Sequence, residues 1–332
     1  MPNREITLIQ AMYEAIAEEM RRDPTVFLMG EDVRLSIYGT SKGLLREFGP
    51  ERVRNTPLSE AAFVGAGVGA AIMGMRPIVD LMVGNFTYVA MDQLCDQAAK
   101  IRYMSGGQCT VPVVYLATTG AEGSAAGQHS DSPYPLFMNM GGLKVVLPST
   151  PHDAKGLLKA AVRDNNPVFY FEPLAIFGDK GPVPEGEFIV PLGVAEVRRP
   201  GTDLTIVATG ALVKRALAAA SELAGEGISA EVIDPRTLVP LDTAGIVASV
   251  RKTGRLVLVD EARRTCGAAA EIAAVVAEEA FDSLLAPIRR VTGPDTPVPF
   301  SPVLERTYVP DTARIVEASH QVVSAKRLAI GG

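Results

Sequence analysis

The sequence has no tryptophan, and only three histidines and three cysteines occur in its 332 residues. The cysteines, Cys95, Cys109 and Cys266, stand far apart and form neither a zinc pattern nor an even set for disulfides. No apolar run reaches the roughly 20 residues of a membrane span. The first ten residues hold charged and polar side chains instead of an apolar signal core. These absences predict a soluble protein of the cytoplasm, with no membrane partner.

An excess of positive charge is also missing. The net charge of −6 argues against nucleic acid as the main partner, because a phosphate-binding domain should be basic. Hydrophobic residues make up 47% of the chain and charged residues 21%, which excludes broad disorder. At roughly 150 residues per domain, the length predicts two domains.

Apolar, β-branched runs alternate with helical patterns along the chain. Strands are expected at 25–30, 76–83, 111–118, 143–149, 167–172, 203–210, 230–238, 255–262 and 287–293. Helices are expected at 7–23, 149–165, 211–227 and 267–284. Many of the strand runs are continuously apolar, which is typical of parallel strands covered on both faces. The alternation predicts an α/β fold with mostly parallel strands.

One segment interrupts this alternation. Residues 177–203 gather proline, glycine and charge, as a linker does. We therefore place a domain boundary near residue 188, which divides the chain into domains 1–187 and 188–332.

The stretch GAGVGA (65–70) fits the loose dinucleotide-binding pattern, but that pattern must follow a strand and open a helix. The preceding residues RNTPLSEAAF do not form a strand pattern. The glycines are better placed inside a helix that begins near Ser59, where they allow another backbone to come close.

Glu60 is the one carboxylate between Thr56 and Met75. Two interpretations are open for it. With Ser59 as the cap, Glu60 favours the positive end of the helix by about 0.3–1 kcal/mol. Alternatively, it is a carboxyl group in a dry pocket, where it can share a proton with a ligand base.

His129 lies in the loop GAEGSAAGQHSDSPYP (120–135), which follows an expected strand, where parallel-sheet proteins place their sites. The neighbouring Ser130 and Asp131 cannot complete a hydrolase triad, whose members converge from separate elements. No second ligand at helical spacing favours a metal site. Phe86 and Tyr88 also follow an expected strand, although aromatic residues there usually belong to the core.

The succession TPLSE, GNFTYVAMDQ, AAKIRYMSGG, QHS, GLKVVLPSTPHDAKGLL and RDNNPVFYFEP resembles the beta subunit of thiamine-diphosphate-dependent 2-oxo acid dehydrogenases. The pyruvate, branched-chain 2-oxo acid and acetoin enzymes belong to that family. The resemblance implies two doubly wound domains: a pyrimidine-binding domain (1–187) and a transketolase C-terminal-type domain (188–332). It also implies decarboxylation of a short 2-oxo acid, or acetoin cleavage, with reductive acylation of lipoyl groups.

The resemblance further implies a thiamine diphosphate shared with an alpha subunit in an α₂β₂ tetramer. The chain has no GDG motif, so the alpha subunit is expected to hold the diphosphate and magnesium. Lipoyl and subunit-binding domains of a dihydrolipoamide acyltransferase would be further partners. Glu60 would be the catalytic glutamate that bonds the pyrimidine nitrogen, Phe86 would stack on that ring with Tyr88 beside it, and His129 would assist proton transfer near the reactive carbon.

A structural potassium site is also implied by the resemblance. Its ligands would be the backbone carbonyls of Val113, Ala161, Asp164 and Asn166. The residues RDNNP (163–167) can otherwise be interpreted as a plain turn.

One position departs from many relatives, which have QHSQ where this chain has QHSD (128–131). Asp131 is expected to place an anion beside His129 and to raise the pKa of its imidazole. The departure leaves the substrate and the acyl acceptor open.

Two alternatives compete with the beta-subunit hypothesis. Half of a split transketolase, or of a deoxyxylulose-phosphate-synthase-like enzyme, would keep the fold but bind sugar phosphates, and the loop at 120–132 has no lysine or arginine for them. A non-catalytic, flavodoxin-like binding module is disfavoured by the length and by the two-domain pattern.

Overall fold

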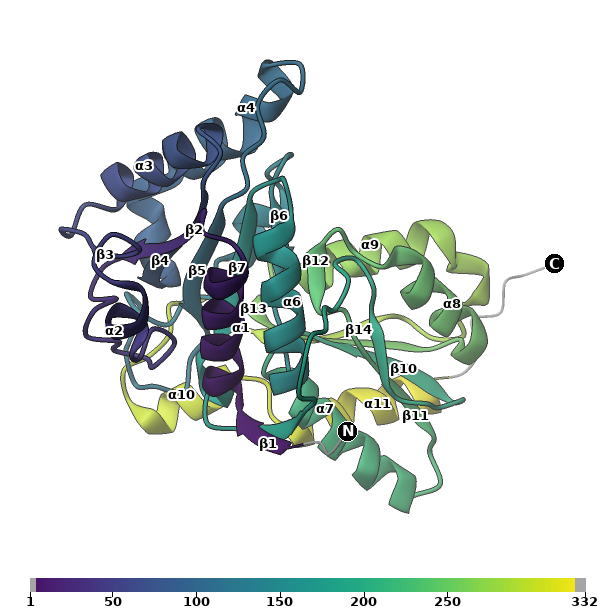
Figure 1. Ribbon diagram of the computed structural model, residues 1–332. Helices are drawn as coiled ribbons and strands as arrows, with labels where there is room; N and C mark the ends of the chain where they lie inside the picture. The colour runs from purple at the N-terminus through teal and green to yellow at the C-terminus, as the bar shows by residue number, and fades with distance from the viewer. Residues whose placement is uncertain (1–3, 326–332) are drawn as a thin grey trace.

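The computed structural model describes residues 4–325 and shows an α/β protein built on two sheets that lie side by side (Figure 1). The first sheet has seven strands in the order β12-β6-β7-β5-β4-β2-β3. All neighbours in it are parallel except β12 and β6. The strands are β2 (Val26–Gly30), β3 (Val53–Asn55), β4 (Arg76–Val83), β5 (Val114–Thr119), β6 (Lys144–Val146), β7 (Val168–Pro173) and β12 (Thr237–Val239).

The second sheet has five strands in the order β14-β13-β10-β11-β9, with only β9 antiparallel. Its strands are β9 (Glu196–Arg199), β10 (Leu204–Ala208), β11 (Ala230–Asp234), β13 (Leu256–Arg263) and β14 (Arg289–Gly293). A short antiparallel pair joins β1 (Arg4–Thr7) to β8 (Lys180–Val183).

Helices cover both sheets. The α-helices are α1 (Leu8–Arg22), α2 (Leu44–Phe48), α3 (Glu60–Ile72), α4 (Ala99–Met104), α5 (Tyr134–Met138), α6 (Pro151–Arg163), α7 (Leu212–Gly225), α8 (Thr243–Thr253), α9 (Ala268–Glu279), α10 (Pro302–Tyr308) and α11 (Thr312–Ser324). The 3₁₀ helices are η1 (Gly84–Ala90), η3 (Leu174–Ile176) and η4 (Phe281–Ser283), and η2 (Asp92–Ala98) is a π-helix. The expected two-domain α/β architecture is therefore confirmed.

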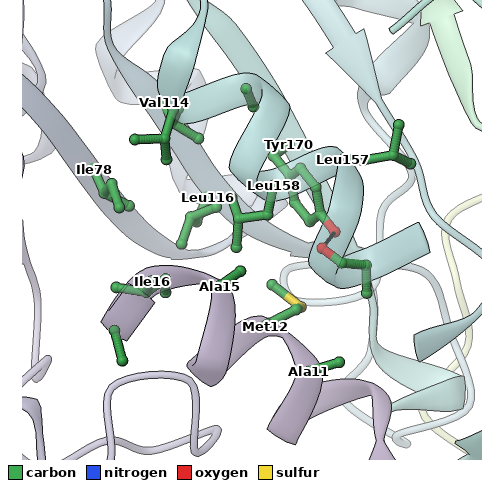
Figure 2. Close-up of a cluster of buried hydrophobic side chains, with 14 of the residues drawn as sticks. Ala11, Met12, Ala15, Ile16, Ile78, Val114, Leu116, Leu157, Leu158 and Tyr170 are labelled. Carbon is green, nitrogen blue, oxygen red and sulfur yellow. Dashed lines mark hydrogen bonds between the residues drawn. The ribbon is translucent and has the colours of Figure 1, made fainter. Parts of the chain in front are cut away.

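Helices α1 and α6 lie side by side against one face of the first sheet (Figures 1 and 2). Met12 and Ile16 of α1, Leu158 of α6 and Tyr170 of β7 are buried in one cluster. The Tyr170 hydroxyl donates to the carbonyl of Ala154 at 2.9 Å, so this buried phenol keeps a partner. The opposite face packs against α3 through a second cluster. Coverage on both faces explains why the strands are continuously apolar.

The glycine-rich stretch forms the helix α3, as predicted, but its glycines differ in how closely other residues approach them. A Cβ on Gly67 would stand 2.7 Å from Val79 Cγ2, so Gly67 lets α3 approach β4 of its own chain. A Cβ on Gly69 would meet nothing within 4 Å. Ser59 occupies the cap position but makes no side-chain cap hydrogen bond. Ser59 is therefore the N-cap residue, as one interpretation expected, but its side chain does not cap the helix.

Residues 230–238 form two strands instead of the single expected one. The chain turns between β11 and β12, where Pro235 lacks a backbone N–H and Arg236 has φ of 60°. The strand β12 then pairs with β6, so the C-terminal half contributes the last strand of the first sheet. The boundary at residue 188 stays a prediction.

The contrast between the two glycines can be tested by unfolding the chain in urea. Gly67→Ala should be less stable than Gly69→Ala by about 1–3 kcal/mol, because the new methyl group overpacks the stiff Val79 side chain. Gly69→Ala should match or exceed the wild type by up to about 1 kcal/mol, since it gains helix propensity in open space. Equal stabilities for the two variants would contradict this account.

Candidate active site

Four carboxylates gather toward the carboxyl ends of the parallel strands in the first sheet. Glu31 directly follows β2, Glu60 is the first residue of α3, Asp80 lies in β4 and Glu172 lies in β7. Glu31 is only 3% exposed, and neither of its carboxylate oxygens has a hydrogen-bond partner among the described residues. Such unpartnered buried oxygens mark a place where a ligand group can bind.

Desolvation controls protonation in this acidic cluster. Burial, followed by the neighbouring charge of Glu60, raises the pKa of Glu31 to about 7. Burial and then the Asp80 carboxylate raise the pKa of Glu172 well above its usual range. The carboxyl of Glu31 therefore retains its proton close to neutral pH and can exchange it with a neighbouring base.

Glu31 was not predicted from the sequence. A signal for it existed, because it is the first polar residue after the apolar run at 25–30, at the edge where parallel sheets hold their sites.

Phe86 and His129 lie in contact, and Tyr88 bonds to Asp131 two residues beyond His129. Phe86 and Tyr88 stand on η1, which packs against α3, the helix that begins with Glu60. The rings of Phe86 and His129 meet edge to face, with their centroids 5.4 Å apart and an interplanar angle of 79°. The His129 side chain is exposed, so it can reach a ligand or a partner group from solvent.

The side chain of Asp131 bonds to Asn85, Tyr88 and Arg263, and its expected effect on His129 stays a prediction. Asp131 Oδ2 accepts hydrogen bonds at 2.9 Å from both the Asn85 amide and the Tyr88 hydroxyl. Asp131 Oδ1 forms an ion pair with the Arg263 guanidinium at 2.7 Å. Burial, together with the Asp131 carboxylate, holds the pKa of Tyr88 above its usual range. Tyr88 thus uses its hydroxyl to hold the loop, while its side chain stays part-exposed.

Carboxylates of the C-terminal half also bind the loop that carries His129. Glu261 in β13 accepts a hydrogen bond from the backbone N–H of Ala121 at 2.6 Å, and burial raises the pKa of Glu261 to about 7. Glu305 in α10 accepts from the backbone N–H of Ser124 at 3.0 Å. The loop is therefore held by both domains.

The expected potassium ligands lie on two adjacent segments. The Val113 carbonyl accepts from the N–H of Val168 at 2.9 Å, and the N–H of Val111 donates to the Asn165 carbonyl at 3.2 Å. The Arg76 guanidinium donates to the Asp164 carbonyl at 3.0 Å, so a cationic side chain already occupies one of the expected acceptors. The expected potassium site stays a prediction.

The fold and the site define a protein of the transketolase class. The "Transketolase, pyrimidine binding domain" pattern matches residues 4–176, and "Transketolase, C-terminal domain" matches residues 193–315. A split-gene transketolase, solved as an inactive beta4 tetramer, superposes with a TM-score of 0.78 at 25% identity, covering 97% of this chain and 99% of that chain.

Proteins with similar sequences show which family within the transketolase class this chain belongs to. The chain is 47% identical to acetoin:2,6-dichlorophenolindophenol oxidoreductase subunit beta of Bacillus subtilis, over 98% of this chain and 99% of the relative. It is 46% identical to pyruvate dehydrogenase E1 component subunit beta-1, mitochondrial, of Arabidopsis thaliana, over 95% of this chain and 89% of the relative. The chain belongs to this family of beta subunits of 2-oxo acid and acetoin dehydrogenases. Across residues 4–325, no helix is long and apolar enough to cross a bilayer.

The buried Glu31 carboxyl should make stability depend on pH. Its pKa of about 7 lies above the ordinary value of 4.5, so the folded state binds more protons between these values and the free energy of unfolding falls as pH rises through them. Glu31→Gln removes this titration. At about pH 8 the variant should be more stable than the wild type by about 2–3 kcal/mol, and the gain should vanish near pH 4.5.

Urea unfolding of the purified chain at both pH values measures the difference. Glu51→Gln is the matched control, because the Glu51 side chain is 87% exposed and should show no such dependence. A gain from Glu31→Gln that is the same at both pH values would rule out a buried, titrating carboxyl.

Proposed function

We propose that this chain is the beta subunit of a heterotetrameric enzyme that uses thiamine diphosphate. The enzyme decarboxylates a short 2-oxo acid, or cleaves acetoin, and passes the acyl group to a lipoyl disulfide. The observation that carries the proposal is the Glu31–Glu60 acidic pair beside the contact between Phe86 and His129. The family membership and the named activities of the relatives support it.

The residues of this site fit the pyrimidine half of the coenzyme. Glu60 would hold the ring nitrogen, and Phe86 would offer its ring as a stacking surface. The Glu31 carboxyl is buried and has no hydrogen-bond partner among the described residues, so a polar group of a bound ligand could supply that partner. When bound, thiamine diphosphate supplies the carbon nucleophile for attack on the substrate carbonyl.

At the pyrimidine end of the coenzyme, the residues of this chain would donate and accept a proton. The apolar helix behind Glu60 and the buried strand ends lower the local dielectric, which strengthens a carboxylate hydrogen bond. Glu31 and Glu60 cannot both ionise cheaply when they are close and desolvated. Glu31, whose pKa is raised to about 7, can therefore hold a proton near neutral pH beside Glu60, which would bond the ring nitrogen.

His129 has a separate role in the proposal. Its exposed imidazole stands at the edge of the Phe86 ring, where it would give or take a proton at the substrate oxygen during acyl transfer. The acceptor would be a lipoyl domain of a dihydrolipoamide acyltransferase, whose subunit-binding domain would hold the tetramer.

An alpha subunit would hold the charged end of the coenzyme. The chain has no GDG motif for the diphosphate and magnesium. The segment before α3 and the end of α3 expose apolar side chains, with Leu58 at 79% and Met73 at 83%. These surfaces suit a partner subunit, and the scattered free cysteines suit an assembly in the cytoplasm.

The comparisons favour a dehydrogenase over a split transketolase. The dehydrogenase and acetoin relatives share 46–47% of their residues with this chain, against 25% for the solved split-gene transketolase. The loop at 120–132 also lacks a basic residue for a sugar phosphate.

The proposal predicts that the chain alone is inactive and that the α₂β₂ assembly is active. In the assembly, Glu60→Ala should lower kcat by about 10²–10⁴, because the proton-carrying carboxyl is lost. Carbon dioxide release from 2-oxo acids, or dye reduction with acetoin, measures the rate. Glu51→Ala should leave it unchanged, since that side chain is 87% exposed. Turnover by the isolated chain, or a near-normal Glu60→Ala rate, would contradict the proposal.

We also propose potassium at the carbonyls of Val113, Ala161, Asp164 and Asn166. The carbonyl donor set and the adjacency of the two segments support it. The purified chain should then melt at a higher temperature in potassium chloride than in sodium chloride of equal ionic strength, because the bound ion stabilises the folded state. Identical melting temperatures in the two salts would exclude a selective site.

A further inference from the structure

The loop that carries His129 has a backbone conformation that hydrogen bonds within the loop, such as His129 N–H to the Ala126 carbonyl, stabilise only in part. Glu122, Ser124 and Ala126 have positive φ angles of 78°, 50° and 60°, which are unfavourable for side chains other than glycine. Contacts from outside the loop must hold such a conformation. The question is which of these contacts controls the position of His129.

Asp131 links this loop to the rest of the site. Its backbone carbonyl accepts from the N–H of Gly120 at 3.3 Å, and its backbone N–H donates to the Asn85 side chain at 3.2 Å. The Asn85 amide also donates to the carbonyl of Gly127 at 3.1 Å. Asn85 and Tyr88 flank Phe86 in the chain, so one carboxylate binds the loop and both sides of that aromatic residue.

The only cation paired with Asp131 among the described residues comes from the other domain. Asp131 is 9% exposed, and Arg263, at the end of β13, supplies the positive charge that balances it. Arg263 is itself held by the Thr296 carbonyl at 3.2 Å. Without this guanidinium the carboxylate would be buried without a counter-charge, and the loop would move to hydrate it.

We propose that Arg263, acting through Asp131, is a positioning residue that sets where His129 stands against Phe86. The expected effect on the rate rests on the proposed function, whereas the expected effect on the loop's position does not. The proposal assigns Asp131 a structural partner in the second domain.

Hydrogen exchange on the isolated full-length chain tests the structural part. The N–H groups of Ala121 and Ser124 donate to Glu261 and Glu305 of the second domain, and that of His129 donates to the Ala126 carbonyl in the loop. In Arg263→Gln these amides should exchange about tenfold faster than in the wild type, because the loop opens more often. Arg264→Gln is the matched control: it removes the same charge from the adjacent residue, whose guanidinium, among residues 4–325, hydrogen-bonds only to the Arg290 carbonyl. Equal protection in both variants would overturn the proposal, whatever the enzyme does.

Kinetics of the α₂β₂ assembly test the functional part. Misplacement of His129 should lower the lipoyl-dependent rate of Arg263→Gln by about ten- to a hundredfold. Reduction of dichlorophenolindophenol needs no acyl transfer and should fall less, whereas general destabilisation would lower both rates alike. Arg263→Lys should recover part of the lipoyl-dependent rate, and Asp131→Asn combined with Arg263→Gln should be no worse than Arg263→Gln alone.

The outcomes separate the two proposals. Equal losses with both acceptors, or additive effects of the two substitutions, would overturn the positioning role. A wild-type assembly without turnover on any 2-oxo acid or acetoin would instead refute the proposed function, and the exchange measurement would still decide whether Arg263 holds the loop.

Discussion

The desolvation of carboxyl groups at one edge of the first sheet is the constraint on which the site depends. Helices on both faces of that sheet exclude water, and Glu31, Asp80 and Glu172 lie toward the carboxyl ends of its strands. A buried carboxylate without a partner is costly, so the protonated form is favoured there. The same burial that stabilises the apolar strands thus creates a group with a pKa near neutrality, which is what proton exchange requires.

The second domain holds the other half of the site. The His129 loop consists of small residues in strained conformations, and it obtains its shape from Glu261, Glu305 and Arg263. All three come from the C-terminal half. That half also supplies β12, the last strand of the first sheet. Residues of both domains therefore hold the loop in which His129 contacts Phe86.

Much of the architecture could be predicted from the sequence. Continuous β-branched runs gave strands, and Thr150 with Pro151 marked the start of α6, where Thr150 Oγ1 accepts from the N–H of Asp153. Glu60 was identified because a lone carboxylate heads an apolar helix. Glu31 was missed although it directly follows the apolar run at 25–30, and the partners of Asp131 were missed because nothing in the neighbouring sequence shows what packs on it. The assignment of Glu60, Phe86 and His129 to a coenzyme came from the family resemblance.

The sequence by itself determined the order of strands and helices, because period and residue type act locally, over a few positions. It also determined which helix needs glycine, since α3 could otherwise not approach β4. The tertiary structure decided which carboxylates are charged, and it paired Asp131 with Arg263 across 132 positions of chain. Electrostatic energy depends on distance and on water exclusion, and both arise only when remote segments fold against one another.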